Sequence, residues 1–258
     1  MEKVIFFGNG PLAEYTLAVI ERECQVVFHA RRREDLEEVC RLKRENPDIH
    51  GMLASFGVII PEPVLELFEP EGIINIHPSL LPHYRGASPI ESAILAGDSD
   101  FSVSVMKLVQ EMDAGPIYYQ TTLSELPLDK DVIYKSLAEA GAEWILKNIT
   151  HLPEPAPQDD SRATFCGKLT KQMGALDPEA DTAEQILRKI VAYQGFPKPK
   201  YTFWGVNCTI LEAHRPKSDE KAVLIIPCSD GYSVAVDRLQ PEGRKAMDAK
   251  SFINGYKK

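Results

Sequence analysis

The sequence lacks the features of membrane, secreted and metal-binding proteins. Its 258 residues include no apolar run near the length of a membrane span, and the opening MEKVIFFGNG begins a strand rather than a signal peptide. The five cysteines form no CxxC pair and do not cluster with histidine, which argues against a zinc site and for a reducing compartment. We therefore expect a cytoplasmic protein without a bound metal.

The sequence also lacks an excess of positive charge. The 29 Lys and Arg residues are outnumbered by 38 Asp and Glu residues, which gives a net charge of −9 at pH 7. Residues 1–150 contain 13 of the basic and 24 of the acidic residues, whereas residues 151–258 contain 16 and 14. This balance argues against a protein that coats nucleic acid non-specifically, but it leaves room for a local basic face in the C-terminal part.

The first glycine cluster, FFGNGPLA, lacks the full pattern of a dinucleotide-binding turn. It follows a buried apolar run, as a phosphate-binding turn at a helix N-terminus does, but the third glycine of GxGxxG is missing. Neither Glu21 nor Glu23 lies where a ribose-binding acid is expected. A tight strand-to-helix turn is the better interpretation, and we reject a dehydrogenase.

Strand and helix patterns alternate along the first 150 residues. Such alternation predicts an α/β fold with a doubly wound, mostly parallel sheet. We expect strands at 4–7, 25–28, 49–55, 73–77, 101–109 and 117–122, the last two antiparallel, and helices at 11–22, 34–45, 61–68, 88–96 and 131–146.

The composition changes at residue 151. The stretch HLPEPAPQDDS contains three prolines in eleven residues, which is typical of an extended linker, and we place that linker at 151–163. The C-terminal part that follows contains one helical pattern and several short strand patterns, which predict a small β-barrel or sandwich. We expect the helix at 183–192 and the strands at 200–203, 208–213, 222–227 and 232–238.

The stretch INIHPSLLPHYRG presents two polar side chains at the end of an apolar run. Asn75 and His77 lie two residues apart, so a strand directs both side chains to the same side, and Pro78 ends that strand. Ligands of open α/β sheets bind at the carboxyl ends of strands. An amide can donate to a developing oxyanion and an imidazole can relay protons, although either residue alone also suits a structural role.

A carboxylate follows the next predicted strand, in QEMDAGPIYYQ. Asp113 lies between that strand and Gly115-Pro116, where it suits the first position of an Asx turn. An Asp beside a His also orients and charges the imidazole. The residues alone leave both interpretations open.

Asn75-x-His77, the PSLLPHYRGASPI that follows and Asp113-x-Gly115 resemble the signature of the 10-formyltetrahydrofolate-dependent formyltransferases. The resemblance implies a formyltransferase fold over 1–150 in which Asn75, His77 and Asp113 are catalytic. ASFGVIIPEPVLELF also resembles the strand and loop that help form the family's folate pocket. The residues expected at that pocket, with 10-formyltetrahydrofolate as the formyl donor, are Phe56, Gly57, Ile59, Leu80, Leu81 and Gly115.

The C-terminal part resembles those members of the family that act on methionyl-initiator tRNA. FCGKLTKQMGALD and GFPKPKYTFWG are similar to their junction and their C-terminal OB-like β-barrel, which contacts tRNA. The resemblance implies formyl transfer to the amino group of methionyl-initiator tRNA, for translation initiation, by a monomer with an OB-like domain over 164–258. A sugar-nucleotide N-formyltransferase is the alternative, and a non-catalytic folate- or RNA-binding protein is a more distant one.

One departure concerns the way in which tRNA is recognised. The tRNA-dependent members have a longer segment with a basic loop after their second strand, whereas here HARRREDLEEV leads directly into a helix. Arg31, Arg32 and Arg33 either take part of that role or solvate the start of the helix. Basic residues elsewhere are candidate phosphate contacts, with ordinary solubilising roles as the alternative. They are Arg85, Lys168, Lys171, Lys198 and Lys200.

Overall fold

A computed structural model describes residues 1–217, 220 and 224–257. The chain forms two compact units. The first consists of Met1–Ile90 and Ser99–Gly167, and the second of Glu91–Asp98 and Lys168–Lys258. The proline-rich stretch at 151–163 therefore belongs to the first unit.

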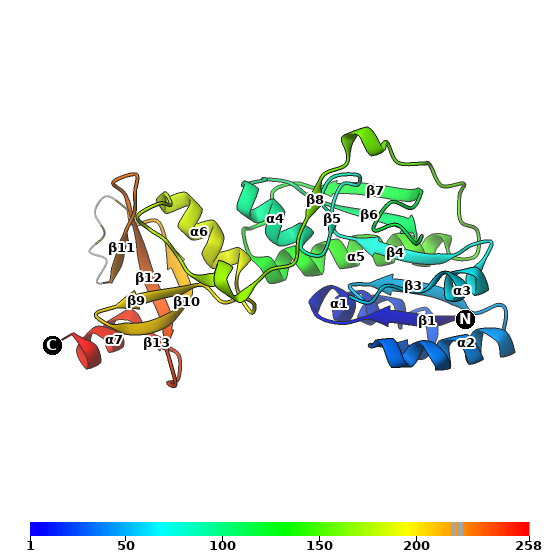
Figure 1. Ribbon diagram of the computed structural model, residues 1–258, viewed down its shortest axis with the longest axis horizontal. Helices are drawn as coiled ribbons and strands as arrows, with labels where there is room; N and C mark the ends of the chain where they lie inside the picture. The colour runs from blue at the N-terminus through cyan, green and yellow to red at the C-terminus, as the bar shows by residue number, and fades with distance from the viewer. Residues whose placement is uncertain (218–219, 221–223, 258) are drawn as a thin grey trace. The chain divides into compact units, whose positions relative to one another are not determined.

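A six-stranded sheet forms the centre of the first unit (Figure 1). Its strands, in spatial order, are β2 (Cys24–Ala30), β1 (Glu2–Gly8), β3 (His50–Ala54), β4 (Ile73–His77), β6 (Phe101–Lys107) and β7 (Ile117–Leu123). The first four are parallel, whereas β6 runs antiparallel to both β4 and β7. The predicted doubly wound, mostly parallel sheet and its antiparallel last pair are confirmed.

Helices flank this sheet and follow the predicted pattern. They are α1 (Pro11–Ile20), α2 (Leu36–Glu45), α3 (Glu62–Leu65) and α5 (Lys130–Asn148), whereas α4 (Pro89–Ala96) begins in the first unit and belongs mostly to the second. Two predicted helices include short 3-10 turns, η1 (Arg33–Asp35) before α2 and η2 (Glu66–Phe68) after α3. Among the described residues, no helix is both long enough and apolar enough to cross a membrane.

The turn between β2 and α2 is organised by a carboxylate. Asp35 accepts hydrogen bonds from the backbone N–H groups of Arg31 at 2.7 Å and Arg32 at 3.1 Å. These bonds, that of Arg31 above all, lower the pKa of the Asp35 carboxyl. The Arg31 carbonyl in turn accepts from the side-chain amide of Asn9. The backbone of the arginine run thus forms a tight turn, in which the side chain of Arg32 is exposed.

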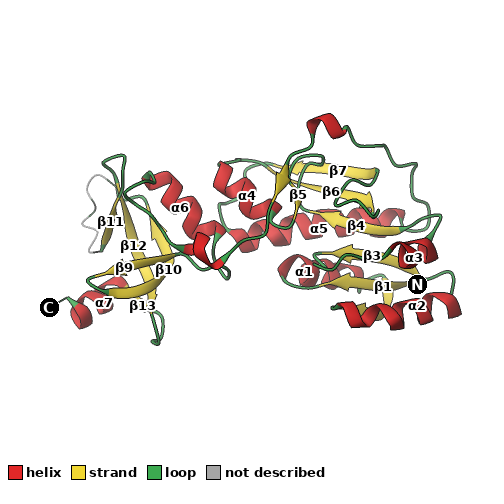
Figure 2. Cartoon of the chain, viewed as in Figure 1, coloured by secondary structure: helices red, strands yellow, loops and turns green. Residues whose placement is uncertain are grey.

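The second unit contains a five-stranded antiparallel sheet (Figure 2). Its strands are β9 (Lys200–Phe203), β10 (Val206–His214), β11 (Ile225–Pro227), β12 (Ser233–Pro241) and β13 (Met247–Asp248). The order is β11-β12-β10-β9, with β13 on β12, so the described residues form an open sheet in which β11 and β9 are not paired with each other. Of the predicted strand at 222–227, residues 222–223 lie outside the described residues.

Two helices pack against this second sheet and contribute to the core of the second unit. They are α6 (Ala183–Ala192), with the predicted bounds, and α7 (Ala249–Tyr256), which the sequence patterns did not predict. Thr182 caps α6 because its hydroxyl accepts from the Gln185 N–H while the Gln185 side chain accepts from the Thr182 N–H. Ile186 of α6 and Phe252 of α7 are fully buried in one apolar cluster with the sheet.

A short parallel ladder joins the chain after the proline-rich stretch to the loop after β4. It consists of β5 (Arg85–Gly86) and β8 (Phe165–Cys166). Gly86 has a φ of +125°, and a Cβ at this position would lie 2.1 Å from the Cys166 carbonyl oxygen. Glycine is therefore required where the two segments meet.

Candidate active site

The carboxyl end of β4 presents two buried polar side chains. Asn75 and His77 are only 4% and 5% exposed, and all five residues of β4 are buried. The strand lies between β3 and β6, and both side chains point to the same side of it because residues alternate along a strand. The site therefore sits at a central strand end, which is the usual ligand position in α/β sheets.

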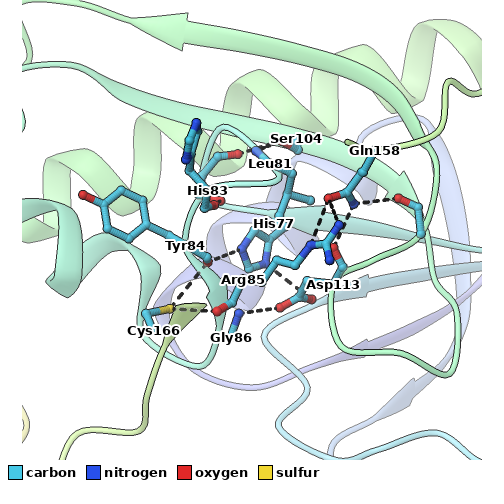
Figure 3. Close-up of polar contacts among 12 residues, drawn as sticks. His77, Leu81, His83, Tyr84, Arg85, Gly86, Ser104, Asp113, Gln158 and Cys166 are labelled. Carbon is cyan, nitrogen blue, oxygen red and sulfur yellow. Dashed lines mark hydrogen bonds and ion pairs between the residues drawn. The ribbon is translucent and has the colours of Figure 1, made fainter. Parts of the chain in front are cut away.

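The imidazole of His77 contacts two different groups through its two nitrogens (Figure 3). Nε2 lies 3.0 Å from the carbonyl oxygen of Tyr84, and a carbonyl can only accept, so Nε2 carries a hydrogen. Nδ1 lies 3.6 Å from Oδ1 of Asp113. Nδ1 is therefore the nitrogen at which a proton can be gained and lost beside a carboxylate.

Asp113 is held in the loop between β6 and β7. Its φ of +51° lies in the left-handed region, which Asp tolerates better than most residues. Its Oδ2 accepts from the backbone N–H of Gly86 at 2.7 Å while Oδ1 faces His77. The structure thus brings together two of the three residues expected to be catalytic, although they lie 36 positions apart (113 − 77) in the sequence.

The loop after β4 is fixed by two polar side chains of the neighbouring strands. Ser104 of β6 donates its hydroxyl hydrogen to the Ser79 carbonyl at 2.6 Å and accepts from the Leu81 N–H at 3.1 Å. Gln120 of β7 donates to the Leu81 carbonyl at 2.9 Å and to the Ser104 hydroxyl at 2.8 Å. This loop leads to Tyr84, so these bonds help to fix the acceptor for His77 Nε2.

Gln158 and Asp160 complete the surroundings of the site, and the sequence analysis missed both. Gln158 donates to the carbonyl oxygens of Asp113 at 2.8 Å and Gly115 at 2.7 Å. It also accepts from Arg85, whose guanidinium donates to Asp160 at 2.7 Å. Both residues lie in the proline-rich stretch, whose composition indicates extended chain and carries no signal of a long-range contact.

Three of the residues expected at the folate pocket are buried inside the protein. Phe56 is buried and makes an edge contact with Phe7, with ring centroids 5.6 Å apart. Leu81 belongs to the loop after β4 and is buried. A Cβ at Gly115 would lie 1.8 Å from the Lys107 carbonyl oxygen, so this glycine permits a close approach of two backbone segments.

The other three are accessible to a ligand. Ile59 is 69% exposed and Leu80 is 43% exposed, so both side chains are open to contact from outside the protein. Gly57 has a φ of +70° and no atom within 4 Å of the position of a Cβ. No group of three or more His, Cys, Asp or Glu side chains suited to a metal occurs in the described ranges.

The basic residues expected to contact phosphate fall into two classes. Arg85 belongs to the first unit, where its side chain is only 5% exposed and its guanidinium is held by Gln158 and Asp160. We therefore assign it to the interior of the site rather than to a phosphate contact. The four lysines of the second unit are exposed: Lys168, Lys171, Lys198 and Lys200.

Lys198 and Lys200 line a groove of the second unit with a volume of about 590 Å³. Polar residues of β9 and β10, including Thr202, Asn207 and Thr209, form much of its lining. We call this feature the β9–β10 groove.

Both parts of the chain match models of formyl transferases. Residues 11–149 match the family described as Formyl transferase, and residues 168–257 match Formyl transferase, C-terminal domain. Methionyl-tRNA formyltransferase of Dehalococcoides mccartyi is 33% identical over 237 residues, which cover 86% of this chain and 74% of that protein. The protein of the same name from Thermus thermophilus is 33% identical over 228 residues, with coverages of 83% and 73%.

Solved structures of three related proteins share the fold. HypX from Aquifex aeolicus, in complex with tetrahydrofolic acid, has a TM-score of 0.73 at 19% identity and covers 100% of this chain and 48% of its own. Methionyl-tRNA formyltransferase from Clostridium thermocellum has a TM-score of 0.69 at 17% identity, with coverages of 93% and 98%. An N-formyltransferase from Helicobacter canadensis, in complex with folinic acid and dTDP-3-aminofucose, has a TM-score of 0.66 at 16% identity, with coverages of 93% and 100%.

The sequence and fold comparisons agree with each other and with the expectation from the signature residues. The family models together cover residues 11–149 and 168–257, and relatives at 33% identity extend over most of the chain. This chain belongs to the formyl transferase family.

Proposed function

We propose that this formyltransferase transfers the formyl group of 10-formyltetrahydrofolate to the amino group of methionyl-initiator tRNA. The observation that carries the proposal is the buried end of β4, where Asn75 and His77 are presented together and His77 Nδ1 faces Asp113 at 3.6 Å. The relatives at 33% identity are named methionyl-tRNA formyltransferases, and the related HypX structure contains tetrahydrofolic acid.

The proposed reaction uses the acceptor amine as the nucleophile, so it needs no Ser or Cys of the protein. The amine nitrogen forms a bond to the formyl carbon, and an oxyanion develops on the formyl oxygen. Asn75 is the proposed amide donor to that oxyanion, and such a donor is worth about 2.7–4 kcal/mol in transition states of this kind. The carbon–nitrogen bond to the folate then breaks, which leaves the formamide on the acceptor.

His77 is the proposed proton carrier, and Asp113 is the proposed partner of its imidazole. The amine loses one proton and the departing folate nitrogen gains one, so a single group that accepts and then donates satisfies the balance. His77 Nδ1 suits this role because Nε2 is committed to the Tyr84 carbonyl. The Asp113 carboxylate stabilises the imidazolium that forms between the two transfers.

The second unit supports tRNA as the acceptor. The β9–β10 groove combines Lys198 and Lys200 with several uncharged hydrogen-bonding side chains and a single carboxylate, Glu242, so lysines outnumber acids in a lining that can contact a phosphate backbone. Lys198 has a φ of +76°, and a Cβ at Gly174 would lie 2.3 Å from its carbonyl oxygen. A lysine held in an unfavourable backbone conformation is consistent with a functional position. We place the chemistry in the first unit and acceptor contacts in the second, on a cytoplasmic monomer.

A sugar-nucleotide N-formyltransferase is the second candidate. It is favoured by the tight turn after β2, because only residues 31–32 separate that strand from η1 and no extended basic loop is present there. The related N-formyltransferase from Helicobacter canadensis was solved with an amino-sugar nucleotide, dTDP-3-aminofucose.

The two candidates make opposite predictions in one assay. Release of tetrahydrofolate from 10-formyltetrahydrofolate is measured with methionyl-initiator tRNA and, separately, with amino-sugar nucleotides. Turnover with the tRNA alone is the expected result. Turnover only with an amino sugar would refute the tRNA assignment and retain the chemistry, whereas folate binding without turnover on any amine would refute both.

A further inference from the structure

We infer that Gln158 is a positioning residue for formyl transfer, which acts by holding the backbone that carries Asp113. The inference rests on the proposed function, because it assigns a role to Gln158 through Asp113 and His77. Gln158 lies in the segment between the two family domains, outside both matched ranges. It is nevertheless part of the first unit and contacts the Asp113 loop directly.

The chemistry of its neighbours fixes the orientation of the Gln158 amide. The oxygen accepts from Nε and Nη2 of Arg85 at 3.0 and 2.6 Å, and a guanidinium can only donate. The nitrogen donates to the carbonyl oxygens of Asp113 and Gly115 at 2.8 and 2.7 Å, and a carbonyl can only accept. If the amide were rotated by 180°, its nitrogen would face the donor groups of Arg85 and its oxygen would face the two carbonyl oxygens. Gln158 thus has one arrangement in which all four hydrogen bonds are satisfied.

These hydrogen bonds close a ring of interactions around Asp113 (Figure 3). Gln158 holds the carbonyl of Asp113, while the N–H of Gly86 donates to the Asp113 carboxylate at 2.7 Å. Gly86 directly follows Arg85, whose side chain returns to Gln158. The main chain and the carboxylate of Asp113 are therefore anchored by two connected points.

Asp113 needs such an anchor because its geometry is demanding. It has a left-handed φ of +51°, and its carboxylate lies 3.6 Å from His77 Nδ1, just outside hydrogen-bonding distance. A small rotation of the loop either closes that gap or removes the carboxylate from the imidazole. Displacements of about 1 Å caused by distant substitutions can lower rates by about 100-fold.

Arg85 contributes to the ring as a buried cation. Its side chain is 5% exposed, and its other carboxylate partner, Asp160, is 76% exposed. The charge is held by the amide oxygen of Gln158 from within the protein and by the Asp160 carboxylate at the surface. Loss of Gln158 removes this acceptor from the guanidinium as well as the donor from the Asp113 loop.

Two variants separate the two halves of the Gln158 amide. Gln158→Ala removes both halves, whereas Gln158→Glu keeps an oxygen for Arg85 but places an acceptor where the donor to Asp113 and Gly115 had been. Glu154→Gln is the matched control, because Glu154 is exposed in the same proline-rich stretch. Thermal unfolding establishes that each variant is folded before its kinetics are compared.

We expect kcat with 10-formyltetrahydrofolate and methionyl-initiator tRNA to fall about 10- to 100-fold in both Gln158 variants. KM for each substrate should change by less than about twofold, because Gln158 touches neither of them in this assignment. Glu154→Gln should match the wild type. Wild-type kcat in Gln158→Glu would show that the bond to Arg85 alone matters, and would overturn the inference.

Hydrogen exchange provides a readout that does not depend on activity. The backbone amides of residues 112–115 should exchange faster in both Gln158 variants than in the wild type or the Glu154 control. Unchanged exchange would overturn the inference even if the rates fell. A wild-type protein that transfers formyl to no amine would instead refute the proposed function, while the exchange result would still decide whether Gln158 holds the loop.

Discussion

The candidate site of the first unit and the β9–β10 groove of the second unit use polar groups in opposite ways. At the site, His77 and Asp113 are largely shielded from solvent, and their hydrogen-bonding atoms are directed at defined partners. In the groove, Lys198 and Lys200 are exposed to solvent. The difference matches the two tasks proposed for these sites. Proton transfer requires fixed distances, whereas phosphate recognition tolerates mobile cations.

The largest effect should come from the side-chain amide of Asn75. We expect Asn75→Ala to lower kcat by roughly 100- to 1,000-fold, because the donor to the developing oxyanion is removed. Binding of the formyl donor, measured by equilibrium titration, should weaken far less. Equal losses in turnover and binding would mean that Asn75 holds the substrate rather than the transition state.

The next effect concerns the rigidity of the Asp113 loop. Gly115→Ala places a Cβ 1.8 Å from the Lys107 carbonyl oxygen, so the loop must shift. We expect a decrease of roughly 1–3 kcal/mol in the free energy of unfolding, measured with urea, together with reduced turnover. Gly167→Ala is the control, since a Cβ there would meet no atom within 4 Å and no left-handed φ is involved. Equal stability of the two variants would contradict the close approach.

A smaller loss is expected from Arg85→Lys. The ammonium group cannot donate from two nitrogens to Gln158 as the guanidinium does, so the buried charge is held by fewer hydrogen bonds. We predict about a tenfold decrease in kcat through displacement of the Asp113 loop. Arg162→Lys, at an exposed position of the same stretch as Gln158, should leave kcat unchanged. A fully active Arg85→Lys enzyme would show that the charge alone suffices.

Removing charge from the groove should alter binding and spare the chemistry. In the double variant Lys198→Ala with Lys200→Ala, we measure the slope of log K for tRNA binding against log salt concentration. The magnitude of this slope should fall by roughly 0.7–0.9 for each phosphate that is no longer neutralised. The value of kcat at saturating tRNA should be retained. The pair Lys168→Ala and Lys171→Ala tests the other two predicted phosphate-binding lysines in the same way. Lys147→Ala, on the exposed face of α5, is the control. An unchanged salt slope would place tRNA elsewhere.

The smallest effect is a pH dependence of the second unit. Hydrogen bonds to Asp237 and then to Glu220 raise the pKa of His214 above its ordinary value. Protonated His214 therefore stabilises the folded state. This stabilisation is complete below about pH 6.5, the pKa of histidine in the unfolded chain, and is lost as the pH rises through the higher pKa of the folded state. Below pH 6.5, the unfolding midpoint temperature of His214→Asn should be slightly lower than that of the wild type. At alkaline pH the two midpoint temperatures should be equal. Parallel curves would show that these ion pairs contribute nothing.

Local signals in the sequence predicted most of the elements correctly. Helix α6 was predicted at its observed bounds, and the structure shows a local capping box of Thr182 and Gln185 at its start. The bounds of β9 were also predicted correctly, at 200–203. Strand β4 and the shared side of Asn75 and His77 followed from alternation and from Pro78. These features depend on neighbours within a few residues.

Contacts between segments that lie far apart in the sequence could not be predicted. Strands β5 and β8 contain two residues each, which is too short for any periodicity, and their pairing depends on Gly86 approaching Cys166. Gln158 lies in a stretch whose prolines indicate an extended chain, and nothing near it in the sequence reveals its hydrogen bond to Asp113. The burial of Arg85 was missed for the same reason, since its partners lie more than 70 positions away.

The inclusion of residues 151–167 in the first unit determines where this enzyme can be divided. A truncation after residue 150 would remove Gln158, Asp160 and the whole of β8, so Arg85 would be left without the partners of its guanidinium. A truncation after Gly167 retains all of them. Chimeras that exchange C-terminal domains between relatives should therefore be joined after residue 167, because residues 151–167 belong to the first unit.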